Sequence, residues 1–567
     1  MSILKRKHGN GLRMMNYDFT PRGSVDTAPF SGCTPLLSAL LRLRGITAEE
    51  EAARFLSPSL KDLHDPFLLP GMREAVELLE RAIEAKDPIL VWGDYDADGV
   101  CAAAILTETL LEAGARADYR LPSRHTEGYG LNEAGIREAA ESFRVLVTVD
   151  CGISAREETA LARSLGMTVI ITDHHALPPE LPEADALISP LLGGYPCPHL
   201  CGAGVALKIC QAMRGMEAVE KRLDLAAIAT VADVVPLLGE NRAIVREGLL
   251  RIAETRRPGL KALLASAGLQ APLCADDLAF RIGPRLNAAG RLEDASVAAE
   301  LLRTEDPARG AELASHLESL NSRRQSLERE ITAQAIRQAE ARPDFGVSRA
   351  LVVAGDWNPG LVGLTAGRLC ERYNLPAVAF SVSGDTATGS CRSIPGVNIF
   401  EMLQRCAGLT ERCGGHAQAA GVTVRTDRID DFRAKLDEVI RASCPETAFR
   451  RQLTYDLEVP FRAWTEESLR SLSLLEPTGC GNPPPVFLLS GTSVQSMRRV
   501  GRDMSHLQLT VLDSNNTLVK GIAFSQGSAA DRPWTDADLL YKPILNDFRG
   551  KRTVEAQIFA ITDCKNS

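Results

Sequence analysis

The stretch PILVWGDYDADG (residues 88–99) decides the fold and the chemistry expected of this chain. Its apolar half, residues 88–93, is typical of a buried strand, and its acidic half leads into a stretch with helical spacing. Three carboxylates, Asp94, Asp96 and Asp98, stand at every second position of the turn. Like charges so close together repel one another unless a cation holds them, so the turn predicts a metal site.

An EF-hand calcium loop shares the D-x-D-x-D-G pattern and is the obvious alternative. Its bidentate Glu would fall at position 105, which is Ile105, and an expected strand rather than a helix precedes the loop. We therefore interpret the turn as the carboxyl end of a strand, which is where open α/β sheets bind their ligands.

The same alternation of apolar strand and helix recurs farther along the chain. VLVTVD (145–150) precedes a helical stretch at 154–165, and TVIITD (168–173) ends directly before His174 and His175. Repeated strand–helix units predict a parallel sheet with helices on both faces. Because each strand ends in Asp, we expect an acidic carboxyl edge.

A further carboxylate, Asp233, lies in the apolar stretch ATVADVVP (229–236). Each of these residues alone has an ordinary explanation, since a strand-end Asp often caps the next helix and a lone His is usually solvated. Four separate segments would each need such an explanation, so we expect one shared site. Carboxylates mixed with imidazole suit Mn²⁺ or Mg²⁺ better than zinc, and two such ions would activate water and clamp a phosphoryl oxygen.

The rest of the chain is organised around one long helical stretch. Residues 306–342 contain neither Pro nor Gly after Gly310, which predicts a helix of about 30 residues. A second α/β lobe follows it, and alternating apolar stretches beyond about residue 485 predict a small antiparallel barrel. Residues 1–30 lack periodicity and predict a loose arm, whereas residues 35–85 show helical patterns.

Composition excludes several classes of protein. A length of 567 residues, 45% of them apolar and 24% charged, predicts three to four globular domains rather than disorder or collagen. No run of 18 apolar residues, no signal-peptide pattern and no CxxC pair among the 14 Cys occur, which favours the reducing cytoplasm without a membrane anchor. The net charge of −9 does not fit a basic coat protein for nucleic acid. The basic residues are mostly Arg, which coding bias or phosphate binding would explain.

The motifs together resemble a known family. Four of them, in this order, are similar to motifs I to IV of the DHH phosphoesterase superfamily: DYDADG (94–99), VDCG (149–152), DHH (173–175) and ATVADVVP (229–236). Four further runs narrow the resemblance to the RecJ family: GPRLNAAGRL (283–292), LNSRRQ (320–325), GSCRSIPGVNI (389–399) and GGHAQAAG (414–421). The match covers roughly residues 70–560.

The resemblance implies an α/β fold in which a parallel-sheet DHH domain and a second α/β DHH-associated domain are joined by the long helix, with a C-terminal OB-fold barrel. In that barrel Phe524, Tyr541 and Phe548 are candidates for base stacking, although a core position explains each equally well, and residues 546–551 (NDFRGK) form a basic cluster suited to phosphates. The implied parts are an N-terminal arm with helices, the DHH domain, the connecting helix, the DHH-associated domain and the OB-fold, at residues 1–70, 71–305, 306–342, 343–448 and 449–567.

The resemblance also implies a set of site residues. One or two Mn²⁺ or Mg²⁺ ions would be held by Asp94, Asp96, Asp98, Asp150, His174 and Asp233. The implied catalytic residues are Asp96, Asp98, Asp150, His174, His175 and Asp233. Contacts to the DNA strand and its 5′-phosphate fall on Arg124, Arg285, Asn287, Ser390, Arg392 and His416. Helix capping and pairing between lobes explain Arg285 and Asn287 nearly as well. At position 358, where the family usually has His, this chain has Asn358.

The implied activity is metal-dependent 5′-to-3′ degradation of single-stranded DNA to 5′-mononucleotides in DNA repair and recombination. Two alternatives stay open: a DHH phosphodiesterase for short oligoribonucleotides or cyclic dinucleotides, and a non-catalytic replisome scaffold. Phosphodiesterases of the first kind are usually shorter than this chain and lack the barrel. Scaffold proteins of the second kind have lost metal ligands that this chain retains. The resemblance also implies a monomer whose partners are single-stranded DNA with a 5′ end, single-strand-binding protein and a RecQ-type helicase. No membrane partner is expected.

Overall fold

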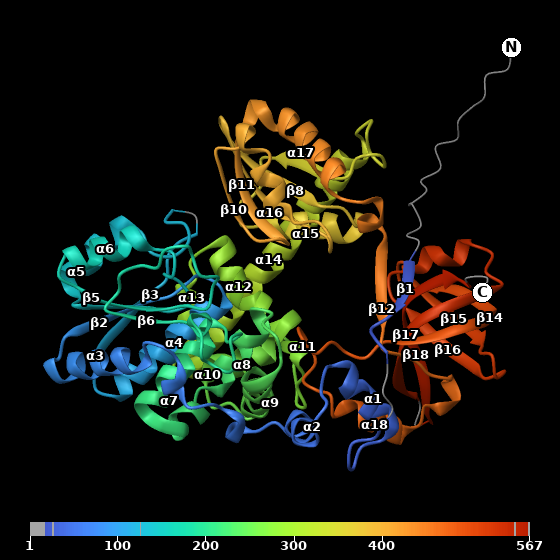
Figure 1. Ribbon diagram of the computed structural model, residues 1–567, viewed down its shortest axis with the longest axis horizontal. Coiled ribbons are helices and arrows are strands. Elements are labelled where there is room, and N and C mark those ends of the chain that lie inside the picture. Colours follow the sequence, from blue (N-terminus) through green and yellow to red (C-terminus); the bar gives the residue numbers. More distant parts are fainter. Residues whose placement is uncertain (1–16, 25–27, 125, 549–550, 565–567) are drawn as a thin grey trace. The chain divides into compact units, whose positions relative to one another are not determined.

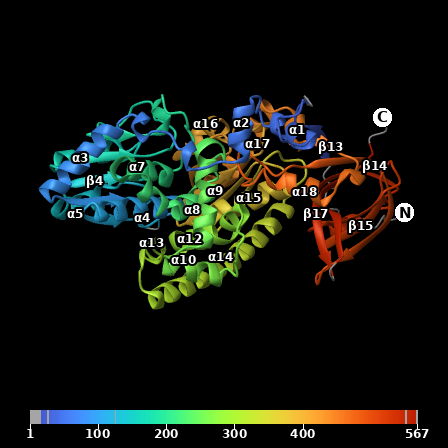
Figure 2. The same cartoon turned by 90° about the horizontal axis from the view of Figure 1, so that it is seen from below.

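The structure is a computed structural model that describes residues 17–24, 28–124, 126–548 and 551–564. The chain forms two compact units. The first unit contains residues 48–330 and 475–484, and the second contains residues 1–47, 331–474 and 485–567. Figures 1 and 2 show the elements of both units from two directions.

The first unit is built on a parallel sheet with the strand order β3-β2-β4-β5-β6. Its strands are β2 (Pro88–Trp92), β3 (Arg116–Arg120), β4 (Val145–Thr148), β5 (Thr168–Thr172) and β6 (Ala186–Ile188). One face packs against α3 (Met72–Ala85), α4 (Ala97–Glu112) and α7 (Gly202–Glu220), and the other against α5 (Glu133–Ser142) and α6 (Arg156–Ser164) (Figure 1). The predicted parallel sheet is confirmed.

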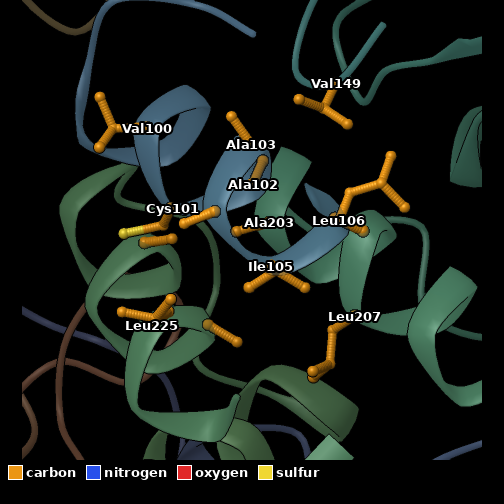
Figure 3. Packing of buried hydrophobic residues seen from close by; sticks show 14 of the residues in the cluster. Val100, Cys101, Ala102, Ala103, Ile105, Leu106, Val149, Ala203, Leu207 and Leu225 are labelled. Carbon is orange, nitrogen blue, oxygen red and sulfur yellow. The ribbon is translucent and has the colours of Figure 1, made fainter. Parts of the chain in front are cut away.

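Helix α4 is buried on all sides from Ala97 to Thr107, where residues 100–106 form an unbroken apolar run. Its small residues Ala102 and Ala103 lie in the same buried cluster as Leu207 of α7 and Leu225 of α8 (Leu223–Ala232), as Figure 3 shows. Small side chains let neighbouring helices approach closely and pack at the density of a protein interior. The helix therefore gives a fixed base to the acidic turn that precedes it.

The other α-helices of the first unit follow the sheet or precede it. They are α2 (Glu49–Leu56), α9 (Gly239–Ala253), α10 (Pro258–Ser266), α11 (Ala275–Asp277), α12 (Gly283–Leu292) and α13 (Ser296–Arg303). Helix α14 (Pro307–Glu340) belongs to the first unit up to Glu330 and to the second from Ile331. The single long helix predicted for residues 306–342 is confirmed.

The second unit contains a mixed sheet with the order β10-β11-β9-β8-β7, in which only β7 and β8 are parallel neighbours. Its strands are β7 (Leu351–Gly355), β8 (Ala377–Ser383), β9 (Thr386–Arg392), β10 (Arg412–Gly415) and β11 (Ala419–Arg425). The helices beside it are α15 (Val362–Tyr373), α16 (Ile399–Gln404) and α17 (Ile429–Ser443). The predicted second α/β lobe is confirmed.

The predicted C-terminal barrel is also confirmed. Its strands are β13 (Leu457–Glu458), β14 (Phe487–Val500), β15 (His506–Leu512), β16 (Leu518–Ala523), β17 (Asp536–Phe548) and β18 (Lys551–Asp563), and α18 (Glu466–Ser473) precedes β14. Strand β14 pairs with both β15 and β17, and β16 pairs with β18, so the sheet closes on itself. The β16–β18 pair is parallel, so the barrel is not wholly antiparallel as predicted. Closure removes the unpaired strand edges that an open sheet would expose.

The N-terminal segment departs from the prediction. Strand β1 (Tyr17–Pro21) pairs in parallel with β12 (Arg451–Tyr455), and α1 (Pro35–Leu43) follows it. The loose arm predicted for residues 1–30 is therefore wrong for residues 17–21, and residues 1–16 of that prediction lie outside the described residues. Periodicity within the segment could not reveal its distant strand partner. In the described ranges no helix combines the length and apolarity needed to cross a bilayer.

Candidate metal centre

The predicted acidic residues of the first unit meet at the carboxyl edge of the parallel sheet. Nε2 of His174, which follows β5, lies 3.0 Å from Oδ1 of Asp150, 3.6 Å from Oδ2 of Asp233 and 3.7 Å from Oδ2 of Asp98. Three overlapping groups have potential ligand atoms within 4.8 Å of one another: Asp98–His174–Asp233, Asp150–His174–His175 and Asp94–Asp96–Asp150. All seven predicted metal and catalytic residues are thus brought into one place.

Several of these ligand atoms are buried without a hydrogen bond. Within the described part of the chain, Oδ1 of Asp94, Oδ1 of Asp150 and Oδ2 of Asp233 have no hydrogen-bond partner. The contact between His174 and Asp150 also lacks hydrogen-bond geometry. Buried polar atoms normally have partners, because leaving them unpaired is costly. Oxygen atoms that converge with an imidazole nitrogen fit a divalent cation of the Mn²⁺ or Mg²⁺ type.

The electrostatics of the cluster point the same way. Burial and the charge of Asp96 raise the pKa of Asp94 to about 8. Burial and the charges of Asp98 and Asp96 raise the pKa of Asp233 to about 8. Burial lowers the pKa of His174, which keeps its imidazole neutral at pH 7 and able to bind a metal. The protein alone therefore cannot ionise all of these carboxylates at neutral pH, whereas a bound cation would favour the ionised forms.

Backbone amides hold two of the carboxylates. Asp96 caps α4, because its Oδ1 accepts hydrogen bonds from the N–H groups of Asp98 (2.9 Å) and Gly99 (3.1 Å). Asp98 accepts from Gly202 (2.6 Å) and Ala203 (2.7 Å) in the first turn of α7. Helix N-termini stabilise negative charge. Capping and metal binding therefore both describe these residues, and the α7 contact had no signal in the sequence.

Asp150 occupies a tightly restricted position. Its φ of 61° lies in the left-handed region, and a Cβ at Gly202 would lie only 2.4 Å from its own Cβ. Such conformations of residues other than Gly cluster at functional sites, where the surroundings hold them in place. The close approach of α7 to Asp150 requires glycine at position 202.

Asp173 orients His175 rather than joining the ligand groups. Its Oδ1 lies 2.7 Å from Nδ1 of His175 and accepts from the backbone N–H of His174, and its Oδ2 accepts from the N–H of Ile153. Burial opposes ionisation of both side chains, but their mutual pairing lowers the pKa of Asp173 and raises that of His175 to about 9. His175 is therefore held in one orientation and protonated at neutral pH.

Sequence reasoning missed Tyr129. Its hydroxyl lies 3.3 Å from Nδ1 of His175 and 3.3 Å from the carbonyl oxygen of Asp150, and its ring packs edge-on against His175. Half of Tyr129 is exposed, at 49%. The only available signal was its position between Gly128 and Gly130, a few residues after Arg124.

The predicted substrate contacts of the first unit are already engaged with protein atoms. The guanidinium of Arg124 lies 4.8 Å from the ring centre of Tyr95. Oδ1 of Asn287 accepts from the N–H of Ala97 (2.8 Å), so it supports the acidic turn. Arg285 forms an ion pair with Glu318 of α14 (2.6 Å). Capping and pairing thus describe the contacts of Asn287 and Arg285, and their contact with a DNA strand stays a prediction.

The predicted residues of the second unit form a different kind of site. Arg392 at the end of β9 donates to Oγ of Ser390 (3.2 Å) and to the carbonyl of Cys391 (2.8 Å). A Cβ at Gly363, in the first turn of α15, would lie 3.0 Å from that Oγ. A guanidinium and a hydroxyl beside a helix N-terminus suit an anion. His416 is exposed in the turn between β10 and β11.

Two further expectations concern Asn358 and the barrel aromatics. Asn358 accepts from the N–H of Gly360 (2.8 Å) and so closes a turn before α15. Of the two readings of Tyr541, the core position is confirmed: the residue is fully buried, and its hydroxyl accepts from Nε1 of Trp464 and donates to the carbonyl of Val459. Phe524 is 52% exposed. The basic cluster expected at residues 546–551 includes residues 549–550, which lie outside the described residues.

Three family models match the chain. The "DHH family, N-terminal domain" covers residues 88–231, the "DHHA1 domain" covers residues 347–442 and the "RecJ OB domain" covers residues 455–559. The first contains the acidic turn, Asp150 and the two histidines, and the second contains Ser390, Arg392 and His416.

Similar proteins match over nearly the whole length of this chain. "Single-stranded-DNA-specific exonuclease RecJ" of Bacillus subtilis is 36% identical over 567 residues, which span 94% of this chain and 72% of that protein. The crystal structure of Thermus thermophilus RecJ in complex with Mn²⁺ matches with a TM-score of 0.81 at 32% identity, covering 94% of this chain and 76% of the other. The Mg²⁺ complex of the same protein matches with a TM-score of 0.76 at 30% identity, covering 94% and 75%.

Proposed function

This chain belongs to the RecJ family of single-stranded-DNA-specific exonucleases, and we propose that it degrades single-stranded DNA from the 5′ end to 5′-mononucleotides in DNA repair and recombination. The observation that carries this proposal is the cluster in which His174 lies within 3.7 Å of Asp98, Asp150 and Asp233. The RecJ OB domain match supports a single strand as the substrate.

We propose that Mn²⁺ or Mg²⁺, as one or two ions, is held by Asp94, Asp96, Asp98, Asp150, His174 and Asp233. When bound, such ions neutralise charge on a phosphodiester and activate water. The protein supplies their positions: α4 and α7 hold Asp96 and Asp98 through backbone amides. His175, protonated and fixed by Asp173, donates a hydrogen bond or the proton to the phosphodiester.

We propose that the second unit receives the 5′ end of the strand. Arg392 and Ser390 would bind the terminal phosphate through a charge-assisted hydrogen bond, and His416 would donate to the strand from its exposed turn. Arg124, Arg285 and Asn287 would contact the strand from the first unit. The boundaries at 71–305, 306–342, 343–448 and 449–567 remain our proposed division into DHH domain, connecting helix, DHH-associated domain and OB-fold.

The two alternatives receive less support. A phosphodiesterase for oligoribonucleotides or cyclic dinucleotides has no need of the barrel that matches the RecJ OB domain. A non-catalytic scaffold has no need of a cluster in which buried oxygens lack partners. We propose that the chain acts in the cytoplasm as a monomer and works with single-strand-binding protein and a RecQ-type helicase, which would supply and expose its substrate.

The test is an assay with purified chain, Mn²⁺ and a DNA strand labelled at either end. We expect labelled mononucleotides from the 5′-labelled single strand, a shortening ladder from the 3′-labelled one, and little cleavage of the same sequence as a duplex. Cleavage of dinucleotides alone would favour the phosphodiesterase alternative. If the chain bound Mn²⁺ but cleaved neither the single strand nor dinucleotides, the scaffold alternative would be favoured.

A further inference from the structure

A short segment far along the chain lies beside the backbone that follows Asp233. Residues 475–484 (LEPTGCGNPP) belong to the first unit, although the residues on either side of them belong to the second. The tip of this segment, Gly479-Cys480-Gly481, touches Pro236 and Leu237. We call residues 475–484 the brace.

A buried arginine holds the start of the brace, residues 475–477. Arg242 of α9 is 1% exposed and donates to three consecutive carbonyl oxygens of the brace, those of Leu475 (3.1 Å), Glu476 (2.8 Å) and Pro477 (2.9 Å). Its guanidinium also stacks on the ring of Phe55, 3.9 Å from the ring centre. A planar group with five donors suits such a fan of carbonyl oxygens. The base of the brace therefore has a fixed position on α9.

A buried asparagine folds the brace into a closed loop. Asn482 is fully buried, and its Nδ2 donates to the carbonyls of Leu475 (2.8 Å) and Pro477 (2.9 Å). Its backbone exchanges two hydrogen bonds with Gly479. These contacts hold the tip of the brace in one conformation.

The tip of the brace contacts the residues that follow Asp233 at two points. The N–H of Leu237 donates to the carbonyl of Cys480 (2.8 Å). A Cβ at Gly481, whose φ is 70°, would lie 2.9 Å from Cβ of Pro236. Asn241 of α9 holds the carbonyl of the same Pro236 (3.0 Å). The backbone at Pro236 and Leu237 is thus held both by the brace and by Asn241 of α9.

The backbone of Val234, between Asp233 and the contacts at Pro236 and Leu237, is strained. Val234 has a φ of 60° and is 67% exposed, an unusual conformation for a β-branched residue. Strain of this kind persists only where the surroundings impose it. Oδ2 of Asp233 has no hydrogen-bond partner in the described residues, so no hydrogen bond fixes that atom.

We propose that the brace is a positioning element of the metal centre: Arg242, Asn482 and Gly481 fix the backbone at Pro236 and Leu237 and thereby aim the carboxylate of Asp233 at the cation. None of the three is among the residues that we propose hold the cation or contact the strand. The inference rests on the proposed function, because it assigns Asp233 to the metal. It extends that function by making the metal centre depend on residues some 240 positions farther along the chain.

The test is Gly481→Ala in the full chain, compared with Gly166→Ala. Both glycines have positive φ, 70° and 82°, but only a Cβ at position 481 meets a neighbour within 4 Å. We expect Gly481→Ala to weaken Mn²⁺ binding about tenfold or more, as changes behind a metal ligand do. Activity at saturating Mn²⁺ should return to within about threefold of the unchanged chain, whereas Gly166→Ala should leave Mn²⁺ affinity unaltered.

Mn²⁺ affinity is measured directly, by the paramagnetic resonance of free Mn²⁺, and as the Mn²⁺ dependence of cleavage. Gly479→Ala, which would press only on the end of the Leu237 side chain, is a milder second variant if Gly481→Ala does not fold, and a two- to fivefold loss of Mn²⁺ affinity is expected from it. Mn²⁺ affinity within twofold of the unchanged chain in the folded variant, or lower activity at saturating Mn²⁺ with unchanged affinity, overturns the inference. An unchanged chain that binds no Mn²⁺ would instead overturn the proposed function.

Discussion

The two candidate sites of this chain are built in opposite ways. In the first unit, Asp98 and Asp150 are almost completely buried at 1% and 2% exposure, and backbone, helix ends and a strained residue restrict them. In the second unit, Ser390 and Arg392 are half-buried on one strand and His416 is exposed. A cation site needs several ligands fixed at once, because like charges must be held together. A phosphate site can be assembled from separate donors that each contribute modestly.

This contrast predicts that a single change in the first unit abolishes activity. Asp150→Asn keeps the shape and tolerates the φ of 61°, which Ala would not, but removes one charge from the cluster. We expect cleavage to fall about 10³-fold or more, since bound metal contributes several kcal/mol to the reaction. Single-strand binding and the circular dichroism spectrum should be retained.

The matched control is Asp118→Asn on the exposed face of β3 in the same sheet, which should cleave like the unchanged chain. An Asp150→Asn protein that still cleaves at more than a tenth of the normal rate would contradict the assignment of Asp150 to the metal centre.

In the second unit, a single change should weaken recognition without abolishing chemistry. Arg392→Ala would remove the charge-assisted hydrogen bond that we propose Arg392 makes to phosphate, worth about 1.5–3 kcal/mol, so we expect KM for a 5′-phosphorylated strand to rise roughly 10- to 100-fold. The preference over a 5′-hydroxyl strand should disappear, and kcat should change little. Arg425→Ala on β11, whose side chain pairs with Asp427, is the control. A fall in kcat with unchanged KM would place Arg392 in the chemistry instead.

The burial of the first site also predicts a stability effect. Asp94 and Asp233 have pKa values of about 8 when folded, above the value near 4 of an exposed Asp. The folded metal-free chain then binds more protons than the unfolded chain between about pH 4 and pH 8, so its stability falls as pH rises through that window. Mn²⁺ should offset this loss.

Calorimetry measures the effect at both pH values with EDTA and with one fixed Mn²⁺ concentration, set to 100 times the dissociation constant found at pH 6. Such a ligand adds about 2.7 kcal/mol, or roughly 5 °C in melting temperature. The gap between the two melting temperatures should widen from pH 6 to pH 8. Asp150→Asn should raise the melting temperature of the metal-free chain, because it relieves repulsion. An Mn²⁺ effect that is equal at both pH values would show that the carboxylates are ionised without metal.

The first site was largely predictable from the sequence, and the reason is geometric. Parallel strands place their carboxyl ends at one edge, so Asp94, Asp150 and His174 had to meet once the strand–helix alternation was recognised. The hydrogen bonds from the first turn of α7 to Asp98 and the strained φ of Val234 could not be predicted. They depend on which helix packs beside the turn, and no local pattern encodes that.

The second unit was predicted less completely, because its pairing is less local. Strand β17 is the hardest strand of the barrel to predict from the sequence, because Pro543 and a bulge at Leu540–Tyr541 interrupt its alternation. Strand β1 depends on a partner more than 400 residues away in the chain. The burial of Tyr541 follows from closure of the barrel, because β17 pairs with both β14 and β18 and places its ring against Phe487.

The smallest predicted effect concerns the aromatic that closure leaves outside. Phe524 is 52% exposed, and its ring lies 5.3 Å from that of His506. Stacking of one base on an aromatic ring contributes about 1–3 kcal/mol, and for a half-exposed ring we expect the lower end of that range, so Phe524→Ala should weaken binding of a long single strand about fivefold. Leu518→Ala, an equally exposed but aliphatic change on β16, should not. Fluorescence anisotropy with a strand long enough to reach the barrel and with a short one separates the outcomes. If Phe524→Ala weakened binding of the long and the short strand equally, the barrel would not extend the binding surface. That surface would then end at Arg392 and His416.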